Sequence, residues 1–258
     1  MSMWFLKLLG HLILITFLTA LTQVGGLIWL ITVFLSIKTK CKKRVIFPVF
    51  YLLFNLVLVP PIASYFGREK LPWFDVNLKP KNWFYPLAFR NYVKPELKNL
   101  LYSSSKASKT QITYLHGNFP FFDKFPLLPH LSHNDGKKID LSFNYLNKNG
   151  NKTNKKPSLS GYGTYVKPNN LTTENCIEKG NWQYDFTKYI TFEIVNDLKF
   201  DSNSTKTIIE TLLSHSETQK VFIEPYLKTR LGLNDRSKIS FHGCKAVRHD
   251  DHIHLQIK

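Results

Sequence analysis

The chain has 258 residues, 43% of them hydrophobic, and a formal net charge of +17, which allows either one large domain or one ordinary domain with a membrane segment. The charge does not indicate a nucleic-acid-binding protein, because the lysines are dispersed and no recognition motif accompanies them. We therefore expect no nucleic-acid partner.

Two uncharged apolar runs near the N-terminus predict a transmembrane hairpin. Residues 12–37 and residues 45–66 each reach or exceed the roughly 20 residues that a spanning helix needs. A cleavable signal peptide is disfavoured, because the first run is longer than an apolar signal region of about 7–15 residues and a second run follows it. We expect residues 1–66 to form two helices, at about 12–37 and 45–66, within a lipid bilayer.

The loop between the two runs predicts the orientation of the hairpin. It reads KTKCKKR over residues 38–44, and a short basic loop stays on the cytoplasmic side. Both chain ends and all residues after about 66 are then expected outside. Cys41 falls in the reducing compartment, whereas Cys176 and Cys244 fall where a disulfide persists. Sequence spacing leaves open whether these two cysteines pair.

The outer part divides into two segments. Residues 67–111 are rich in aromatic residues and proline, then helical and polar, and predict an interfacial neck and linker. From residue 112 to 258, strand-like and helical patterns interleave irregularly, without repeats or a glycine-rich phosphate loop. This second segment therefore predicts a domain of the α+β class.

Two histidine-rich segments of that domain indicate a metal site. His130, His133 and Asp140 form one, and His252 and His254 stand two residues apart in the terminal strand. Residues i and i+2 of a strand share a face, so both imidazoles address one point. Zinc takes nitrogen and carboxylate ligands and leaves one position open in catalytic sites. We expect the ligands to be His133, Asp140 and His254, with His252 beside the open position.

The motifs H-x2-H-x2-G-x3-D (130–140) and H-x2-H-x-H (249–254) resemble those of the penicillin-insensitive murein endopeptidase family. That family belongs to a wider group of zinc peptidases with lysostaphin and the D-alanyl-D-alanine metallopeptidases, related in fold to hedgehog domains. Residues 219–233 also resemble the family's strand-proline-helix segment before the second motif. The resemblance covers about residues 112–258 and not the hairpin. It implies a small antiparallel sheet flanked by helices, with the site in a groove.

Carried over residue by residue, the resemblance implies Zn²⁺ ligands at His133, Asp140 and His254. It implies that His252 is catalytic and that His130 and His249 lie in or next to the metal shell. Relatives that cleave D-Ala-D-Ala use Glu-x-x-His with glutamate as the general base, and Asp251 stands in that place here. Aspartate is shorter and would face away from His254 on a regular strand, so His252 is the expected base and Asp251 the alternative. No substrate-binding residue is assigned.

The resemblance implies a bacterial hydrolase. The two apolar runs and the basic loop between them predict that it is a multi-pass protein of the cytoplasmic (inner) membrane, with its C-terminal domain on the periplasmic or extracellular side. We expect a zinc metallopeptidase that acts on peptidoglycan peptides, as a murein endopeptidase or a DD-carboxypeptidase. The alternative is a non-catalytic, zinc-containing module that binds the cell wall. The cleaved bond and the oligomeric state stay open.

Overall fold

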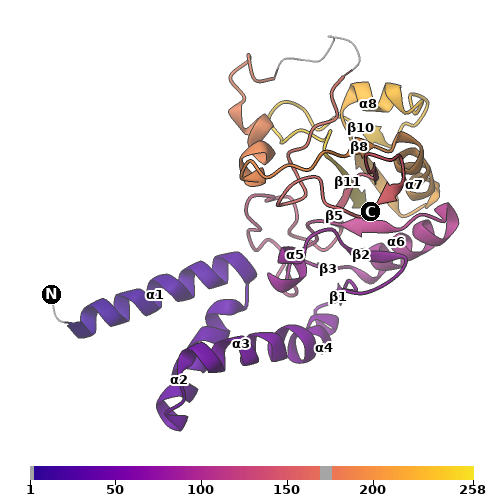
Figure 1. The fold of residues 1–258 in the computed structure, drawn as a ribbon. Helices are drawn as coiled ribbons and strands as arrows, with labels where there is room; N and C mark the ends of the chain where they lie inside the picture. Colours follow the sequence, from indigo (N-terminus) through magenta and orange to yellow (C-terminus); the bar gives the residue numbers. More distant parts are fainter. Residues whose placement is uncertain (1–2, 169–175) are drawn as a thin grey trace.

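The computed structural model describes residues 3–168 and 176–258 and has the expected α+β class (Figure 1). An apolar helical region precedes a domain built on a sheet. The helices of the N-terminal region are α1 (Met3–Thr22), α2 (Gly25–Thr39), α3 (Lys43–Leu53), the π-helix η1 (Phe54–Leu58) and α4 (Val59–Tyr65).

The expected first span, residues 12–37, is wrong in its bounds, because the structure divides this run into two helices. Gln23 lies between α1 and α2 with a φ of 66°, which ends the first helix. Gly26 lets α2 approach α1 closely, since a Cβ there would lie 2.7 Å from the carbonyl oxygen of Ile15. The run is uncharged throughout, and the segment TQVGG (22–26) is the local sign of this turn in the sequence.

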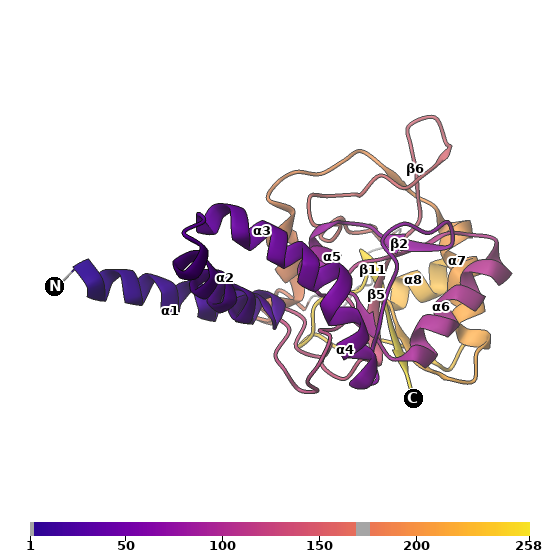
Figure 2. The ribbon, with the colours of Figure 1, turned by 90° about the horizontal axis from the view of Figure 1, so that it is seen from below.

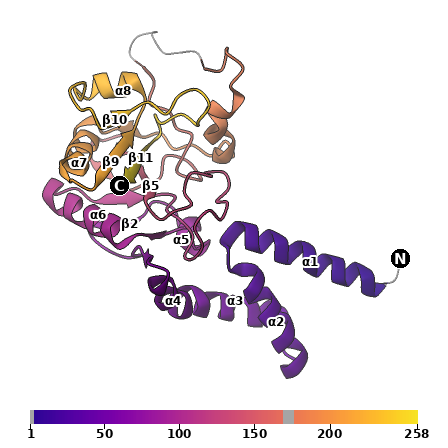
Figure 3. The ribbon, with the colours of Figure 1, turned by 180° about the vertical axis from the view of Figure 1, so that it is seen from behind.

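Two helical stretches among the described residues are long and apolar enough to cross a membrane: Met3–Thr22 and Lys43–Tyr65. The second stretch joins α3, η1 and α4. Helix α2 has 15 residues and a length of about 22 Å, less than the roughly 30 Å of a bilayer's hydrocarbon core. The turn between α1 and α2 lies beside α5 (Phe84–Leu87), whereas the N-terminal end of α1 lies far from the sheet (Figures 1 and 3).

The largest sheet within residues 3–168 and 176–258 has six strands. They are β2 (Leu78–Pro80), β4 (Ile112–Tyr114), β5 (Lys138–Ser142), β9 (Thr218–Phe222), β10 (Ile239–Ser240) and β11 (His252–Ile257), in the spatial order β10-β9-β11-β5-β4-β2. The central strand β11 is antiparallel to β5 and β9, but the outer pairs β10-β9 and β4-β2 are parallel. The sheet is therefore mixed, and the expected antiparallel arrangement holds only at its centre.

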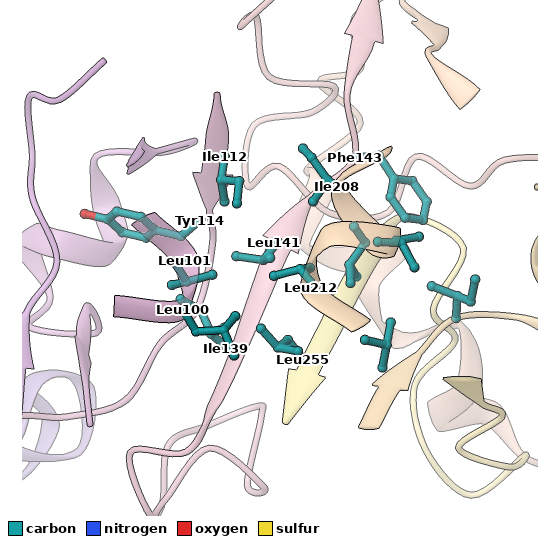
Figure 4. Packing of buried hydrophobic residues seen from close by; sticks show 14 of the residues in the cluster. Leu100, Leu101, Ile112, Tyr114, Ile139, Leu141, Phe143, Ile208, Leu212 and Leu255 are labelled. Atoms are coloured by element: carbon teal, nitrogen blue, oxygen red, sulfur yellow. The ribbon is translucent and has the colours of Figure 1, made fainter. Parts of the chain in front are cut away.

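Helices α6 (Pro95–Ser108) and α7 (Ser202–Ser214) cover one face of this sheet, and the N-terminal helices lie on the other side (Figure 2). The core between the sheet and the two helices is mostly aliphatic and includes the aromatic side chains of Tyr114 and Phe143 (Figure 4). It contains Leu141 of β5, Leu255 of β11, Leu101 of α6 and Leu212 of α7. Burial of such side chains is the main source of stability for this part of the fold.

The segment 67–111, expected as neck and linker, contributes to the same sheet and core. Its strand β2 pairs with β4, and its helix α6 packs against α7. Asn55 of η1 joins this segment to the apolar helices, because its side-chain amide donates to the carbonyl of Pro86 at 2.9 Å. Lys70 donates in turn to the side-chain oxygen of Asn55 at 2.7 Å.

The remaining elements lie around the main sheet. They are β1 (Glu69–Lys70), β3 (Tyr92–Val93), β6 (Tyr145–Leu146), β7 (Lys152–Thr153), the 3₁₀-helix η2 (Trp182–Thr191), β8 (Lys199–Phe200) and α8 (Pro225–Arg230). Cys176 and Cys244 form a disulfide, with their Cα atoms 5.2 Å apart, and Cys41 is free and exposed. The pairing that the sequence left open is therefore present.

Candidate metal centre

The register of β5 and β11 brings the two histidine motifs together. His254 lies opposite Asp140, and His252 lies opposite Ser142. Alternate residues of each strand, such as Leu141, point into the aliphatic core. The side chains between them face the other side of the sheet. Asp140 and His254, 114 residues apart in the chain, thus become direct neighbours.

Three ligand atoms converge there. Nε2 of His133 lies 3.2 Å from Oδ1 of Asp140 and 3.2 Å from Nδ1 of His254, and Nδ1 of His254 lies 2.9 Å from the same oxygen. Ligands of a tetrahedral zinc ion are about 3.3 Å apart, given metal–ligand distances of about 2.0–2.1 Å. Nδ1 of His133 donates to the carbonyl of Gly117 at 3.0 Å, which leaves Nε2 with a free lone pair. The three residues therefore fit a metal ion.

The second oxygen of Asp140 has different neighbours. Oδ2 lies 3.0 Å from Nδ1 of His130 and accepts a hydrogen bond of 2.7 Å from the hydroxyl of Tyr162. His130, His133 and Asp140 also form a buried group that could hold a metal ion, with ligand atoms within 4.8 Å of one another. We favour His254 over His130 as the third ligand, because its nitrogen faces the same Asp140 oxygen as His133.

His252 completes the arrangement without joining the three closest ligands. Its Nε2 lies 3.7 Å from Oδ1 of Asp140 and has no hydrogen-bond partner within the described part of the chain. Its Nδ1 contacts Oδ1 of Asp251, whose other oxygen accepts from the backbone nitrogen of Gly163 at 2.5 Å. Asp251 therefore holds the His252 ring from behind and does not itself face Asp140. A buried imidazole nitrogen without a partner is consistent with a ligand or substrate next to it.

His249 and Asp250 occupy different positions. The ring of His249 lies 4.9 Å from that of His252 and 5.6 Å from that of His254, centroid to centroid. Asp250 faces away and binds the guanidinium of Arg248, whose Nε donates to it at 2.7 Å. His249 therefore borders the centre, whereas Asp250 points away from it and binds Arg248.

Burial decides the charge of most imidazoles here. It lowers the pKa of His254 to about 4, lowers that of His130, and holds that of His249 well below its usual value. Neutral imidazole is the form that binds metals. His252 differs: burial acts against its charge, but the carboxylates of Asp251 and Asp140 raise its pKa overall.

The carboxylate at the centre remains ionised. Burial alone would raise the pKa of Asp140, but the surrounding imidazoles of His133, His252 and His130 hold it well below its usual range. A buried carboxylate is costly without a counter-charge, and a divalent cation held by it and the neighbouring imidazoles would supply that charge. The electrostatics and the geometry thus agree.

Sequence reasoning did not identify Tyr162 or Gly163. Both lie in the loop that follows residue 157, and Gly163 has a φ of 79°. A Cβ at this glycine would lie 2.5 Å from the carbonyl oxygen of Thr187, so only glycine lets its nitrogen reach Asp251. The tyrosine between two glycines, GYG at 161–163, was the signal in the sequence. His116 and His242 also border the centre, with rings 4.7 Å from His130 and 5.9 Å from His254.

The structure thus brings together every residue that the two motifs nominated: His130, His133, Asp140, His249, Asp251, His252 and His254. Comparisons with known proteins add no family to this geometry. No family model matches the chain, and no curated protein matches it. The functional argument therefore depends on the site itself.

Proposed function

We propose that this protein is a membrane-anchored zinc metallopeptidase that hydrolyses a peptide bond of peptidoglycan, in the manner of murein endopeptidases or DD-carboxypeptidases. One observation carries the proposal: His133, Asp140 and His254 converge within 3.2 Å of one another, beside an unpartnered nitrogen of His252. Two imidazoles and one carboxylate are a donor set that suits zinc. The motif resemblance supports the same reading.

The residues of the centre suit hydrolysis of an amide. A zinc ion on the three ligands would polarise the scissile carbonyl and lower the pKa of water to about 7. Nε2 of His252 takes a proton from the attacking water and returns a proton to the leaving amine as the C–N bond breaks. Asp251 and Gly163 fix the tautomer and the orientation of that imidazole.

The apolar helices support a membrane location. In the proposed topology, α1 and the stretch Lys43–Tyr65 cross the bilayer, and between them α2 with its flanking residues returns the chain from the outer to the cytoplasmic side. The N-terminal end of α1 and the basic residues 38–44 then share the cytoplasmic side. The sheet domain lies on the opposite side, where the Cys176–Cys244 disulfide persists and where the cell wall is found. This arrangement differs from the hairpin expectation, which put the N-terminus outside.

Metal content tests the proposal directly. We expect about one zinc per chain in full-length protein purified in detergent, and its loss in the His133→Ala/His254→Ala double variant. His215→Ala is the matched control, because this histidine lies at the end of α7 and outside the centre. Digestion of isolated peptidoglycan by the zinc-loaded protein then tests the reaction. Wild-type protein that takes up no zinc contradicts the proposal.

One observation favours a second candidate, a non-catalytic zinc-containing module that binds the wall. The imidazoles of His133, His252 and His254 are all buried, and structural zinc sites are closed in this way. In such a module His252 would serve as a fourth ligand. The zinc affinity of His252→Ala separates the two candidates. The variant should lose affinity in the non-catalytic module, where His252 is a ligand, and should keep it in the peptidase, where His252 is not.

A further inference from the structure

A cavity of about 450 Å³ lies next to the metal centre. Its size falls within the roughly 300–1,000 Å³ of small-molecule sites. Most of its wall is apolar and comes from segments distant in sequence: Leu21, Phe84, Leu128, Leu159, Ile190 and Phe192. The peptidase proposal assigns no role to this cavity.

The cavity connects a membrane helix with the metal centre. Leu21 belongs to the last turn of α1, which is one of the two candidate membrane spans. His116 lines the cavity too, and its ring lies 4.7 Å from that of His130. A molecule in the cavity would therefore extend from the end of a membrane-spanning helix to the histidines around Asp140.

The charges that line the cavity are positive. Arg90 and Lys156 contribute cations, and the described lining residues include no aspartate or glutamate. Arg90 is buried, and its guanidinium donates to the carbonyls of Leu128 at 2.7 Å and Leu21 at 3.0 Å. No carboxylate lies within ion-pair distance of it in residues 3–168 and 176–258. Burying a cation without a counter-charge is costly, and an anionic ligand would offset that cost.

His116, a second polar residue of the cavity wall, has a ring nitrogen without a hydrogen-bond partner among the described residues. This nitrogen, Nδ1, is buried. On its other side, Nε2 of His116 lies 3.5 Å from the Arg90 guanidinium. The two side chains place a cation and an imidazole nitrogen without a described partner beside each other in the wall of a mostly apolar cavity.

The rim of the cavity is apolar and open to the surroundings. Leu128 and Phe192 both line the cavity and are 55% and 69% exposed. Exposed apolar side chains grouped around a cavity mark a membrane or ligand contact more often than a wet surface. Because α1 ends here, these side chains lie where the bilayer surface is expected.

We propose that this cavity binds the hydrocarbon chain of an anionic lipid-linked molecule, whose head lies toward Arg90 and His116. The positive charges of the lining favour an anionic ligand over a wholly apolar one. The position of the cavity at the end of α1 favours a ligand held in the membrane over a wholly soluble one. The proposed peptidase would then take its peptide from a membrane-bound precursor; this part of the inference rests on the proposed function. The binding itself does not.

Photo-crosslinking of full-length protein in nanodiscs tests the binding. The probe is dodecyl phosphate with a diazirine at the end of the alkyl chain, and labelled peptides are mapped by mass spectrometry. We expect labels on the segments that contain Leu128, Leu159 and Ile190, and several-fold less labelling by the uncharged dodecanol analogue. Leu159→Trp fills the cavity and should abolish the label. Val76→Trp is the matched control, because Val76 is exposed and is not among the lining residues.

Thermal unfolding is measured on the same samples to show that each variant is folded, and zinc content is measured beside it. Equal labelling by the phosphate and the alcohol, or an unchanged label in zinc-loaded Leu159→Trp, overturns the inference. Loss of the label in that variant alone supports it. A protein that is labelled as expected but binds no zinc would contradict the peptidase proposal and leave the lipid site standing. A zinc-loaded, active protein without label would contradict the lipid site and leave the peptidase proposal standing.

Discussion

The N-terminal helices and the sheet domain distribute polarity in opposite ways. In α1 and α3, apolar side chains such as Phe17 and Val49 are exposed. In the sheet domain, the charged and polar side chains of Asp140, Asp251 and His252 are fully buried. Each region is thus unfavourable in water by itself. The proposed function completes each region with something outside the chain: a hydrocarbon surrounding for the helices and a cation for the carboxylate and imidazoles.

The largest expected effect concerns the reaction in the polar region. His252→Ala should lower hydrolysis of isolated peptidoglycan by roughly 10²- to 10⁴-fold, the usual contribution of a positioned general base. Zinc content should stay at the wild-type level, since three other residues would hold the ion in the proposed site. Both quantities are measured on the same preparation. Full activity, or loss of zinc, would contradict the role assigned to Nε2 of His252.

The disulfide gives the next effect and tests the side on which the sheet domain lies. Cys176→Ser/Cys244→Ser removes a link between residues 68 apart in sequence, which constrains the unfolded chain by about 4 kcal/mol. We expect a clearly lower thermal unfolding midpoint for this variant. Cys41→Ser is the matched control, because Cys41 is free and exposed, and it should leave the midpoint unchanged. Equal midpoints in all three proteins would show that the bond does not form.

A charge in α1 tests the apolar region. Phe17→Lys should make membrane insertion of the segment 3–22 less favourable, by at most the roughly 2.5–3.5 kcal/mol that a lysine costs at the centre of a span, because a lysine within the hydrocarbon is poorly solvated. The apparent insertion free energy is measured by translocon-mediated insertion of this segment in a host membrane protein. Phe17→Leu keeps the apolar character and should insert as the native segment does. Unimpaired insertion of the lysine variant would mean that α1 does not span.

The smallest effect concerns the support of the metal centre. Tyr162→Phe removes the hydrogen bond to Oδ2 of Asp140, and the loss of such a partner weakens metal affinity by about 10- to 100-fold. Tyr145→Phe is the matched control, because Tyr145 is also buried but its hydroxyl has no partner within the described residues. Zinc affinity is measured by competition with a chelator. Equal affinities in the two variants would remove Tyr162 from the site.

The sequence by itself determined the features that depend on local patterns. The α+β class, the terminal strand and the apolar character of residues 3–65 follow from periodicity and composition. The prediction of His133, Asp140 and His254 as metal ligands also needed only two short motifs and the two-residue repeat of a strand. Their meeting in space agrees with that prediction, because His254 lies opposite Asp140 in the sheet.

Tertiary structure decided what depends on contacts between distant segments. The turn at Gln23 lies inside an uncharged run, where the short segment TQVGG (22–26) does not by itself divide the run into two helices. The pairing of β2 with β4, the bond from Tyr162 to Asp140 and the Cys176–Cys244 disulfide join residues about 20 to 70 positions apart, beyond the reach of periodicity. The cavity beside His116 likewise exists only because the end of α1 packs near the sheet domain. Local propensity acts along the chain, whereas these features arise from packing across it.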